Sequence, residues 1–211
     1  MSKGHAVRPW AWATGAIALV DESLDTRSFA VTIPTEGYTA WARIDSAEHV
    51  RRQQGGLGAV TSTALLSSLW ELPSGGSVPA NSLSESVVAR LRSASCVVSE
   101  SAEGFTRTYA PIGAVDAVAF AGNRPGDVVK RAASFSPIVR RYAIVRARKV
   151  SAEAISCAQL YGVGLILQED AAVVLVEPSP PETGRPHVYR WWLAELAYAH
   201  IELGVDPTFQ L

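Results

Sequence analysis

The sequence predicts an α/β protein whose mixed central sheet has flanking helices and follows a β-rich N-terminal region. Composition is the first observation: of 211 residues, 48% are hydrophobic and 18% are charged, which excludes general disorder. Short β-prone runs fill the front of the chain, and helix-spaced segments alternate with apolar runs after Ser82. A chain of this length can bury a core without disulfides or a structural metal.

Three β-prone runs, residues 16–20, 29–33 and 38–44, predict strands in the front of the chain. The first belongs to an apolar run at 10–20 that resembles a secretory signal. Its two tryptophans, and the acids that follow at 21–22, favour a core strand instead. No apolar run is long enough to span a membrane.

A helix is predicted over residues 60–72, where apolar side chains recur at helical spacing. The Pro- and Gly-rich segment 73–79 then stops the helix and provides a flexible connector. We therefore divide the chain into a β-rich region, residues 1–80, and an α/β domain, residues 81–211.

The second half alternates between helices and strands more clearly. Asn81 caps a helix over 82–94, an extended run covers 96–99, and a strand interrupted by Pro111 and Gly113 covers 107–120. Residues 139–150 contain a β-prone core, and Ser151 caps a helix at 152–161. Strands at 165–167 and 173–176 follow. The order after Ser82 is helix, strand, strand, helix, strand, strand.

This order resembles the core of the PD-(D/E)xK nuclease superfamily in the C-terminal part of the chain, which implies a restriction-endonuclease-like core. The run Gly-Ala-Val-Asp-Ala-Val at 113–118 is similar to the strand that bears the family's metal-binding acid, here Asp116. The segment 142–148 stands where the family has its acidic-x-Lys strand. Arg146 and Arg148 occupy those two positions, so the motif is degenerate. Glu153, in the following helix, is the other candidate acid.

Catalysis of this kind needs two carboxylates that converge on a divalent cation, and arginine cannot bind Mg²⁺. Asp116 is therefore also interpreted as a structural acid, paired with Arg146. We expect little or no metal-dependent cleavage by the protein alone. No cofactor is expected, except Mg²⁺ if the protein is an active nuclease.

Cationic residues gather between positions 124 and 149, where eight arginines and lysines accompany one acid, Asp127. Such a stretch can form a phosphate-binding face, or it can be a solvated face with intramolecular partners. Neighbours in a strand point to opposite faces, so the eight cannot all serve one surface. The candidate nucleic-acid-binding residues are Arg140, Arg141, Arg146, Arg148 and Lys149.

The C-terminal segment 188–200 predicts a helix whose core stripe contains Tyr189, Trp192 and Leu193. Trp191 and Tyr198 form a second face that could bind a partner or stack a base. Cys96 and Cys157 are expected to be buried thiols, because neither has a second ligand at metal-binding spacing.

The sequence thus predicts a cytoplasmic, nucleic-acid-binding and catalytically inactive nuclease-like protein of a DNA/RNA-processing or defence assembly, with DNA as the preferred ligand. The alternatives are an active metal-dependent nuclease and a structural or adaptor protein. A protein partner or self-association is expected through the N-terminal region or the C-terminal helix. No membrane partner is expected.

Overall fold

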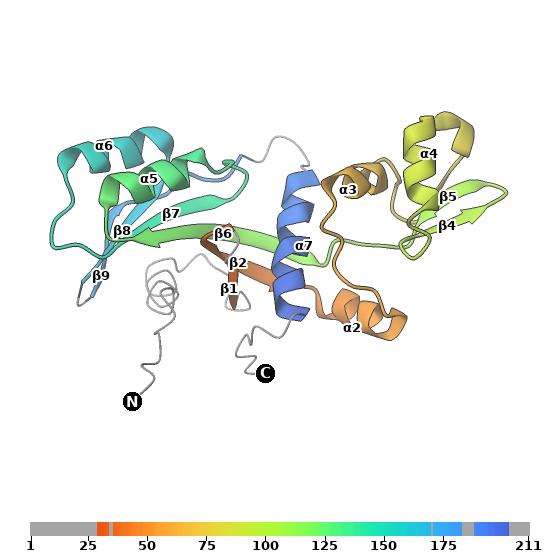
Figure 1. Cartoon of the computed structure of the whole chain (residues 1–211), viewed down its shortest axis with the longest axis horizontal. Coiled ribbons are helices and arrows are strands. Elements are labelled where there is room, and N and C mark those ends of the chain that lie inside the picture. Colours follow the sequence, from red (N-terminus) through yellow and green to blue (C-terminus); the bar gives the residue numbers. More distant parts are fainter. Residues whose placement is uncertain (1–28, 34–35, 170, 183–187, 203–211) are drawn as a thin grey trace, which may run out of the picture. The chain divides into compact units, whose positions relative to one another are not determined.

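The computed structural model describes residues 29–33, 36–169, 171–182 and 188–202, and this part of the chain is α/β (Figure 1). It forms two compact units from interleaved segments. The first contains the described residues up to Arg43 and those from Val115 to Glu182. The second contains Ile44 to Ala114 and the C-terminal helix. The predicted division after residue 80 falls inside the second unit.

The first unit is built on a six-stranded mixed sheet with the order β1-β2-β6-β7-β8-β9, as the sequence predicted in outline. β1–β2 and β8–β9 pair antiparallel, whereas β6, β7 and β8 run parallel. The predicted strand at 16–20 lies outside the described residues. The strands are β1 (Phe29–Ile33), β2 (Tyr38–Ile44), β6 (Gly113–Gly122), β7 (Arg140–Val145), β8 (Gly164–Gln168) and β9 (Ala172–Val176).

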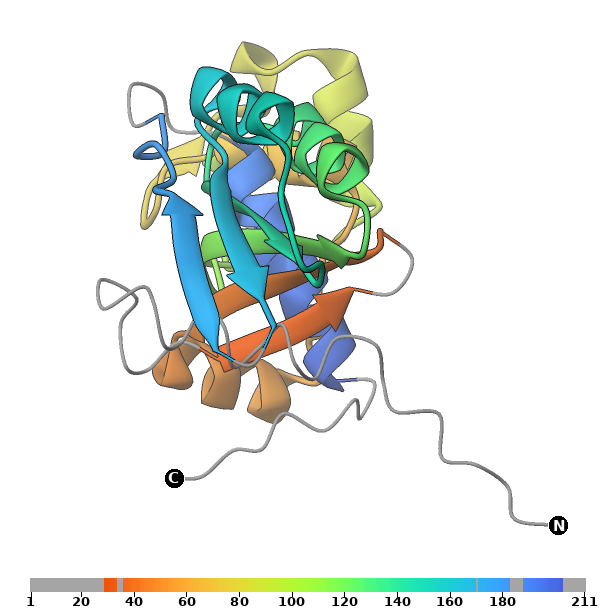
Figure 2. The ribbon, with the colours of Figure 1, turned by 90° about the vertical axis from the view of Figure 1, so that its left-hand side faces the viewer.

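Two helices of ten residues each connect the parallel strands: α5 (Pro125–Ser134) joins β6 to β7, and α6 (Ala152–Tyr161) joins β7 to β8. Both lie on the same face of the sheet (Figures 1 and 2). Pro125 begins α5, where its fixed φ suits a first turn. Ser151 caps α6, as predicted, by accepting a hydrogen bond from the Ala154 amide at 3.2 Å. α5 was not predicted.

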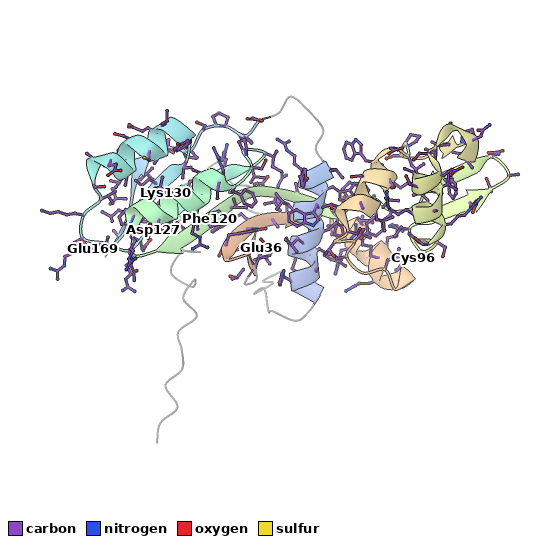
Figure 3. All side chains as sticks on the ribbon, turned by 45° about the horizontal axis from the view of Figure 1, so that its top comes forward. Glu36, Cys96, Phe120, Asp127, Lys130 and Glu169 are labelled. Atoms are coloured by element: carbon purple, nitrogen blue, oxygen red, sulfur yellow. The ribbon has the colours of Figure 1, made fainter. Side chains whose placement is uncertain are left out.

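Side chains alternate between the two faces of this sheet. Phe120 points to the helices, where its ring contacts those of Tyr38 and Phe135, and it lies beside α5 in Figure 3. The neighbouring residues Ala119 and Ala121 belong to an apolar cluster on the other face. The buried members of that cluster are Trp41, Ala117, Ala119, Ala121, Tyr142, Ile144 and Ile166.

The second unit combines helices with a small antiparallel sheet of order β3-β5-β4. Its helices are α2 (Ser46–Gly55), α3 (Thr63–Trp70), α4 (Glu85–Arg92) and α7 (Val188–Glu202), with a short 3₁₀ turn at Ala80–Ser82. Its strands are β3 (Ser77–Val78), β4 (Val98–Ser101) and β5 (Gly104–Arg107). Gly104 has φ 124°, and a Cβ there would lie 2.1 Å from the Val78 carbonyl oxygen. Only glycine allows this close approach.

An ionic network is buried in the second unit. The Arg52 guanidinium, which is 0% exposed, donates to both Glu195 carboxylate oxygens at 2.8 Å and to Glu48 at 2.9 Å. Glu195 also accepts hydrogen bonds from the Tyr109 hydroxyl at 2.7 Å and the Trp191 indole at 2.9 Å. The network joins α2, α7 and the chain between β5 and β6. Because each charge has several partners, the cost of burying it is offset.

α7 buries Leu193, as predicted, but its buried side also contains two residues that were assigned to a second face. Trp191 is 3% exposed and Tyr198 is fully buried, whereas Tyr189, assigned to the core, is 51% exposed. The Glu195 contact fixes this rotation of the helix, because it places Trp191 and Tyr198 on the network side. Cys96 is exposed and Cys157 is half-buried, so the prediction of two buried thiols was wrong. Among the described helices, none combines the length and hydropathy needed to cross a membrane.

Candidate nucleic-acid interface

Asp116 forms a bidentate ion pair at the amino end of β6. Its two carboxylate oxygens accept hydrogen bonds from Arg43 Nε at 2.7 Å and from Arg43 Nη2 at 2.8 Å. Arg43 lies on β2, so the pair ties together two strands of the first unit. The interpretation of Asp116 as a structural acid agrees with this geometry, but its partner is Arg43 and not Arg146.

The strand arrangement separates Asp116 from the residues expected beside it. β6 and β7 run parallel, with Gly122 paired to Val145. Arg146 and Arg148 therefore lie beyond the carboxyl end of β7, whereas Asp116 lies near the start of β6, about 20 Å away along the sheet. Glu153 lies in the first turn of α6, which begins at the carboxyl-end edge. The structure does not bring Asp116 and Glu153 together.

Arg141 is occupied inside the first unit, so we correct its assignment to a nucleic-acid surface. It is 9% exposed and donates to the carbonyls of Ala133 at 3.3 Å, Phe135 at 3.1 Å, and Tyr161. These carbonyls lie at the ends of α5 and α6, where a cation is favourable. Burial lowers the pKa of Arg141, although the charge of Glu182 acts in the opposite direction. Arg140 begins β7, at the same end of the strand.

The remaining candidates, Arg146, Arg148 and Lys149, lie together in the loop between β7 and α6, which we call the cationic loop (residues 146–149). All three are exposed, and none forms an ion pair with another residue of the described chain. The Arg146 amide donates to the Gly122 carbonyl at 3.0 Å, which anchors the base of the loop on β6. The sequence grouped these three residues as candidates, but it predicted that Arg146 and Arg148 lie on a strand, and β7 ends before them at Val145.

The surroundings of the cationic loop carry both signs of charge. Arg124 lies in the loop before α5, and Asp127 lies in the first turn of that helix. Their side chains are 4.0 Å apart, so these two charges largely offset each other. Glu153 lies in the first turn of α6, and Glu169 follows β8. Figure 3 shows Asp127 and Glu169 at this carboxyl-end edge and Lys130 further along α5. Both helices also point their N-termini at this edge, which favours an anion there.

Sequence reasoning missed Gln168 at the end of β8. Its side-chain carbonyl oxygen is buried and accepts no hydrogen bond from the described residues. Its place after the apolar run 165–167 could have marked it as a residue at a strand end. The sequence gives no sign that the oxygen lacks a partner.

Within the described ranges, no cluster of three His, Cys, Asp or Glu side chains could hold a metal ion. The expected lack of metal-dependent cleavage stays a prediction. No family model, curated protein or solved structure matches this chain.

Proposed function

We propose that this protein binds nucleic acid through the cationic loop, with the side chains of Arg148 and Lys149 on the phosphate backbone. The observation that carries the proposal is the exposure of Arg146, Arg148 and Lys149 in one loop, with no acidic partner among the described residues. Positive side chains that no acid of the described chain neutralises are available to replace the counterions of a polyanion.

The position of the loop supports a ligand site. In open α/β sheets, ligands bind outside the carboxyl ends of the strands, and the cationic loop follows β7 at that edge. Arginine suits phosphate because its planar guanidinium donates two parallel hydrogen bonds. The N-terminus of α6 adds a partial positive charge beside Lys149.

The second unit supports this assignment by contrast. Its exposed arginines have partners: Arg92 pairs with Glu100 at 2.8 Å, and Arg51 pairs with Glu48 at 2.6 Å. Glu85 and Glu103 add negative charge to the exposed surface of α4 and of the hairpin between β4 and β5. Phosphate binding is therefore assigned to the first unit. A role in DNA or RNA processing, or in defence, is part of the proposal.

The test measures binding of a fluorescein-labelled DNA duplex by fluorescence anisotropy at several salt concentrations. The variant Arg148→Gln/Lys149→Gln should bind about tenfold or more weakly at low salt, because it removes two phosphate contacts. The slope of log affinity against log salt should fall by about two units.

Arg92→Glu is the matched control, because it changes the net charge by the same amount on an exposed residue of the second unit. It should leave the salt slope at the wild-type value. Wild-type affinity and slope in a folded Arg148→Gln/Lys149→Gln protein would overturn the proposal. An equal loss in both variants would show that only net charge matters, and would overturn it too.

A further inference from the structure

A groove of about 270 Å³ lies between the two helices of the first unit, α5 and α6. Its lining consists of Val129, Lys130, Ala133 and Ser134 from α5, and of Cys157 and Tyr161 from α6. Most of this lining is apolar. The groove is open to solvent, because Lys130, Ser134 and Tyr161 are exposed.

Two large apolar side chains of α6 are exposed beside the groove. Leu160 is 77% exposed and Tyr161 is 53% exposed. Leu160 follows the groove residue Cys157 by three positions, so it lies on the same side of the helix, toward α5. Single exposed apolar residues are common on protein surfaces, but here a projecting leucine stands next to an apolar hollow. One surface thus carries both a protruding side chain and a space that can receive one.

Charges of opposite sign lie on the two sides of the groove. Lys130 of α5 and Glu153 of α6 are exposed, and neither forms an ion pair with another residue of the described ranges. Glu153 precedes Leu160 by seven residues, which is about two turns, so both lie on one stripe of α6. This stripe therefore offers an apolar side chain and an acid, whereas the groove offers apolar walls and a cation.

The direction of the helices decides how the two surfaces can meet. α5 and α6 run parallel, because each connects two parallel strands of one sheet. Lys130 and Cys157 both line the groove, and Glu153 lies one turn before Cys157. If a second copy lies parallel to the first with its leucine in the groove, its Glu153 comes within reach of the long Lys130 side chain. An antiparallel copy would carry that acid past the opposite end of the groove.

We infer that a second copy of this chain occupies the groove, so that the protein forms a two-fold symmetric dimer through α5 and α6. Each copy places Leu160 in the groove of the other and pairs its Lys130 with the other copy's Glu153. Two helices of ten residues present a face of only about 300 Å² per copy, which is typical of a weak and reversible contact. This surface differs from the two segments that the sequence suggested for self-association.

The first test measures self-association of the protein without nucleic acid, by sedimentation equilibrium over a range of concentrations. Leu160→Asp should raise the dissociation constant of the dimer about tenfold or more, because the symmetry removes a buried leucine from both halves of the contact. Val50→Asp is the matched control, since Val50 is a 47% exposed apolar residue on a helix of the second unit. It should keep the wild-type dissociation constant.

Charge reversal tests the pairing between copies. Lys130→Glu and Glu153→Lys should each weaken the dimer about threefold or more, because each creates two like-charge contacts. An equal mixture of the two variants should associate as tightly as wild type, since the mixed dimer restores both pairs of opposite charge. A contact within one chain could not give this rescue.

The two cysteines report the contact in the wild-type protein. Cys157 lines the groove, whereas Cys96 is exposed in the second unit. Alkylation of Cys157 by iodoacetamide should slow as the protein concentration rises, while alkylation of Cys96 keeps its rate. Equal slowing of both thiols would indicate unspecific aggregation and overturn the inference.

The outcomes also separate this inference from the proposed function. A monomer at every concentration would overturn the dimer, and so would a dimer that Leu160→Asp leaves unchanged. Salt-dependent DNA binding by such a monomer would leave phosphate binding intact. The parallel arrangement places both cationic loops at the same end of the pair, a consequence that rests on the proposed nucleic-acid binding. Dimers that fail to bind DNA would therefore overturn the proposed function alone.

Discussion

The two units use arginine in opposite ways. In the second unit, Arg52 is completely buried and donates to two carboxylates, and its neighbour Arg51 adds a partly exposed bond to Glu48. In the first unit, Arg146 and Arg148 follow a strand, are exposed and have no acidic partner in the described chain. The same side chain therefore serves the fold in one place and is available to a ligand in the other. What differs is whether a carboxylate of the described chain lies within ion-pair distance.

Loss of Arg52 should have the largest effect on stability. Arg52→Met leaves Glu195 and Glu48 buried without their shared cation, which should cost about 3–5 kcal/mol. Arg51→Met removes only a partly exposed pair, and should cost about 1 kcal/mol or less. Urea denaturation followed by circular dichroism measures both. Equal losses for these adjacent residues would contradict the distinction between a buried and a surface arginine.

Loss of Arg141 should come second. Arg141→Met removes hydrogen bonds to the carbonyls that end α5 and α6, and each bond to a charged donor contributes about 1.5–3 kcal/mol. We expect a net loss near the lower value, about 2 kcal/mol, because methionine still fills the space. DNA affinity should not change, and this is measured by anisotropy under conditions where the variant is folded. A smaller slope of log affinity against log salt in the variant would show that Arg141 contacts the nucleic acid.

Acid should cause the smallest effect, through Glu48. Burial raises the pKa of Glu48, but the hydrogen bonds from Arg51 and Arg52 outweigh it, so the net shift is downward. A lowered folded-state pKa stabilises the protein above the unfolded value, about 4.3, and that contribution disappears as the pH falls through the folded value. The stability difference between wild type and Glu48→Gln should therefore be largest at neutral pH and shrink below about pH 4. A stability difference that increases as the pH falls would contradict the lowered pKa of Glu48.

Local patterns predicted much of the first unit. The strands at 29–33 and 38–44 and the helix at 152–161 agree with β1, β2 and α6, because apolar runs and the Ser151 cap act over a few residues. α5 was missed because Pro125 and Gly126 open a segment that reads as a loop. Without α5, β6 and β7 could not be recognised as parallel, and Asp116 was placed next to Arg146.

Long-range pairs were beyond what the sequence could show. Asp116 and Arg43 are 73 positions apart, and no local pattern connects them. The rotation of α7 depends on the contact between Glu195 and Arg52, so the sequence assigned Tyr189 to the core where the structure buries Trp191 and Tyr198. The gathering of cationic residues was predicted because their charges are close together in the sequence, but Arg146 and Arg148 were placed on a strand, which the structure ends at Val145. Arg140 and Arg141 lie at the start of β7 and the cationic loop follows its end. The sequence alone did not show this separation.

The hydrogen bonds between Arg52 and Glu195 also limit when the second unit can finish folding during synthesis, because 143 positions separate the two residues. At about 5–20 residues per second, a ribosome would need roughly 7–30 s to supply the carboxylate after it has made the guanidinium. In the first unit, β2 and β6 are neighbours in one sheet, although most of the residues between them in the sequence belong to the second unit. Neither unit can close before most of the other has been translated, and the second unit must stay incomplete until its last helix emerges.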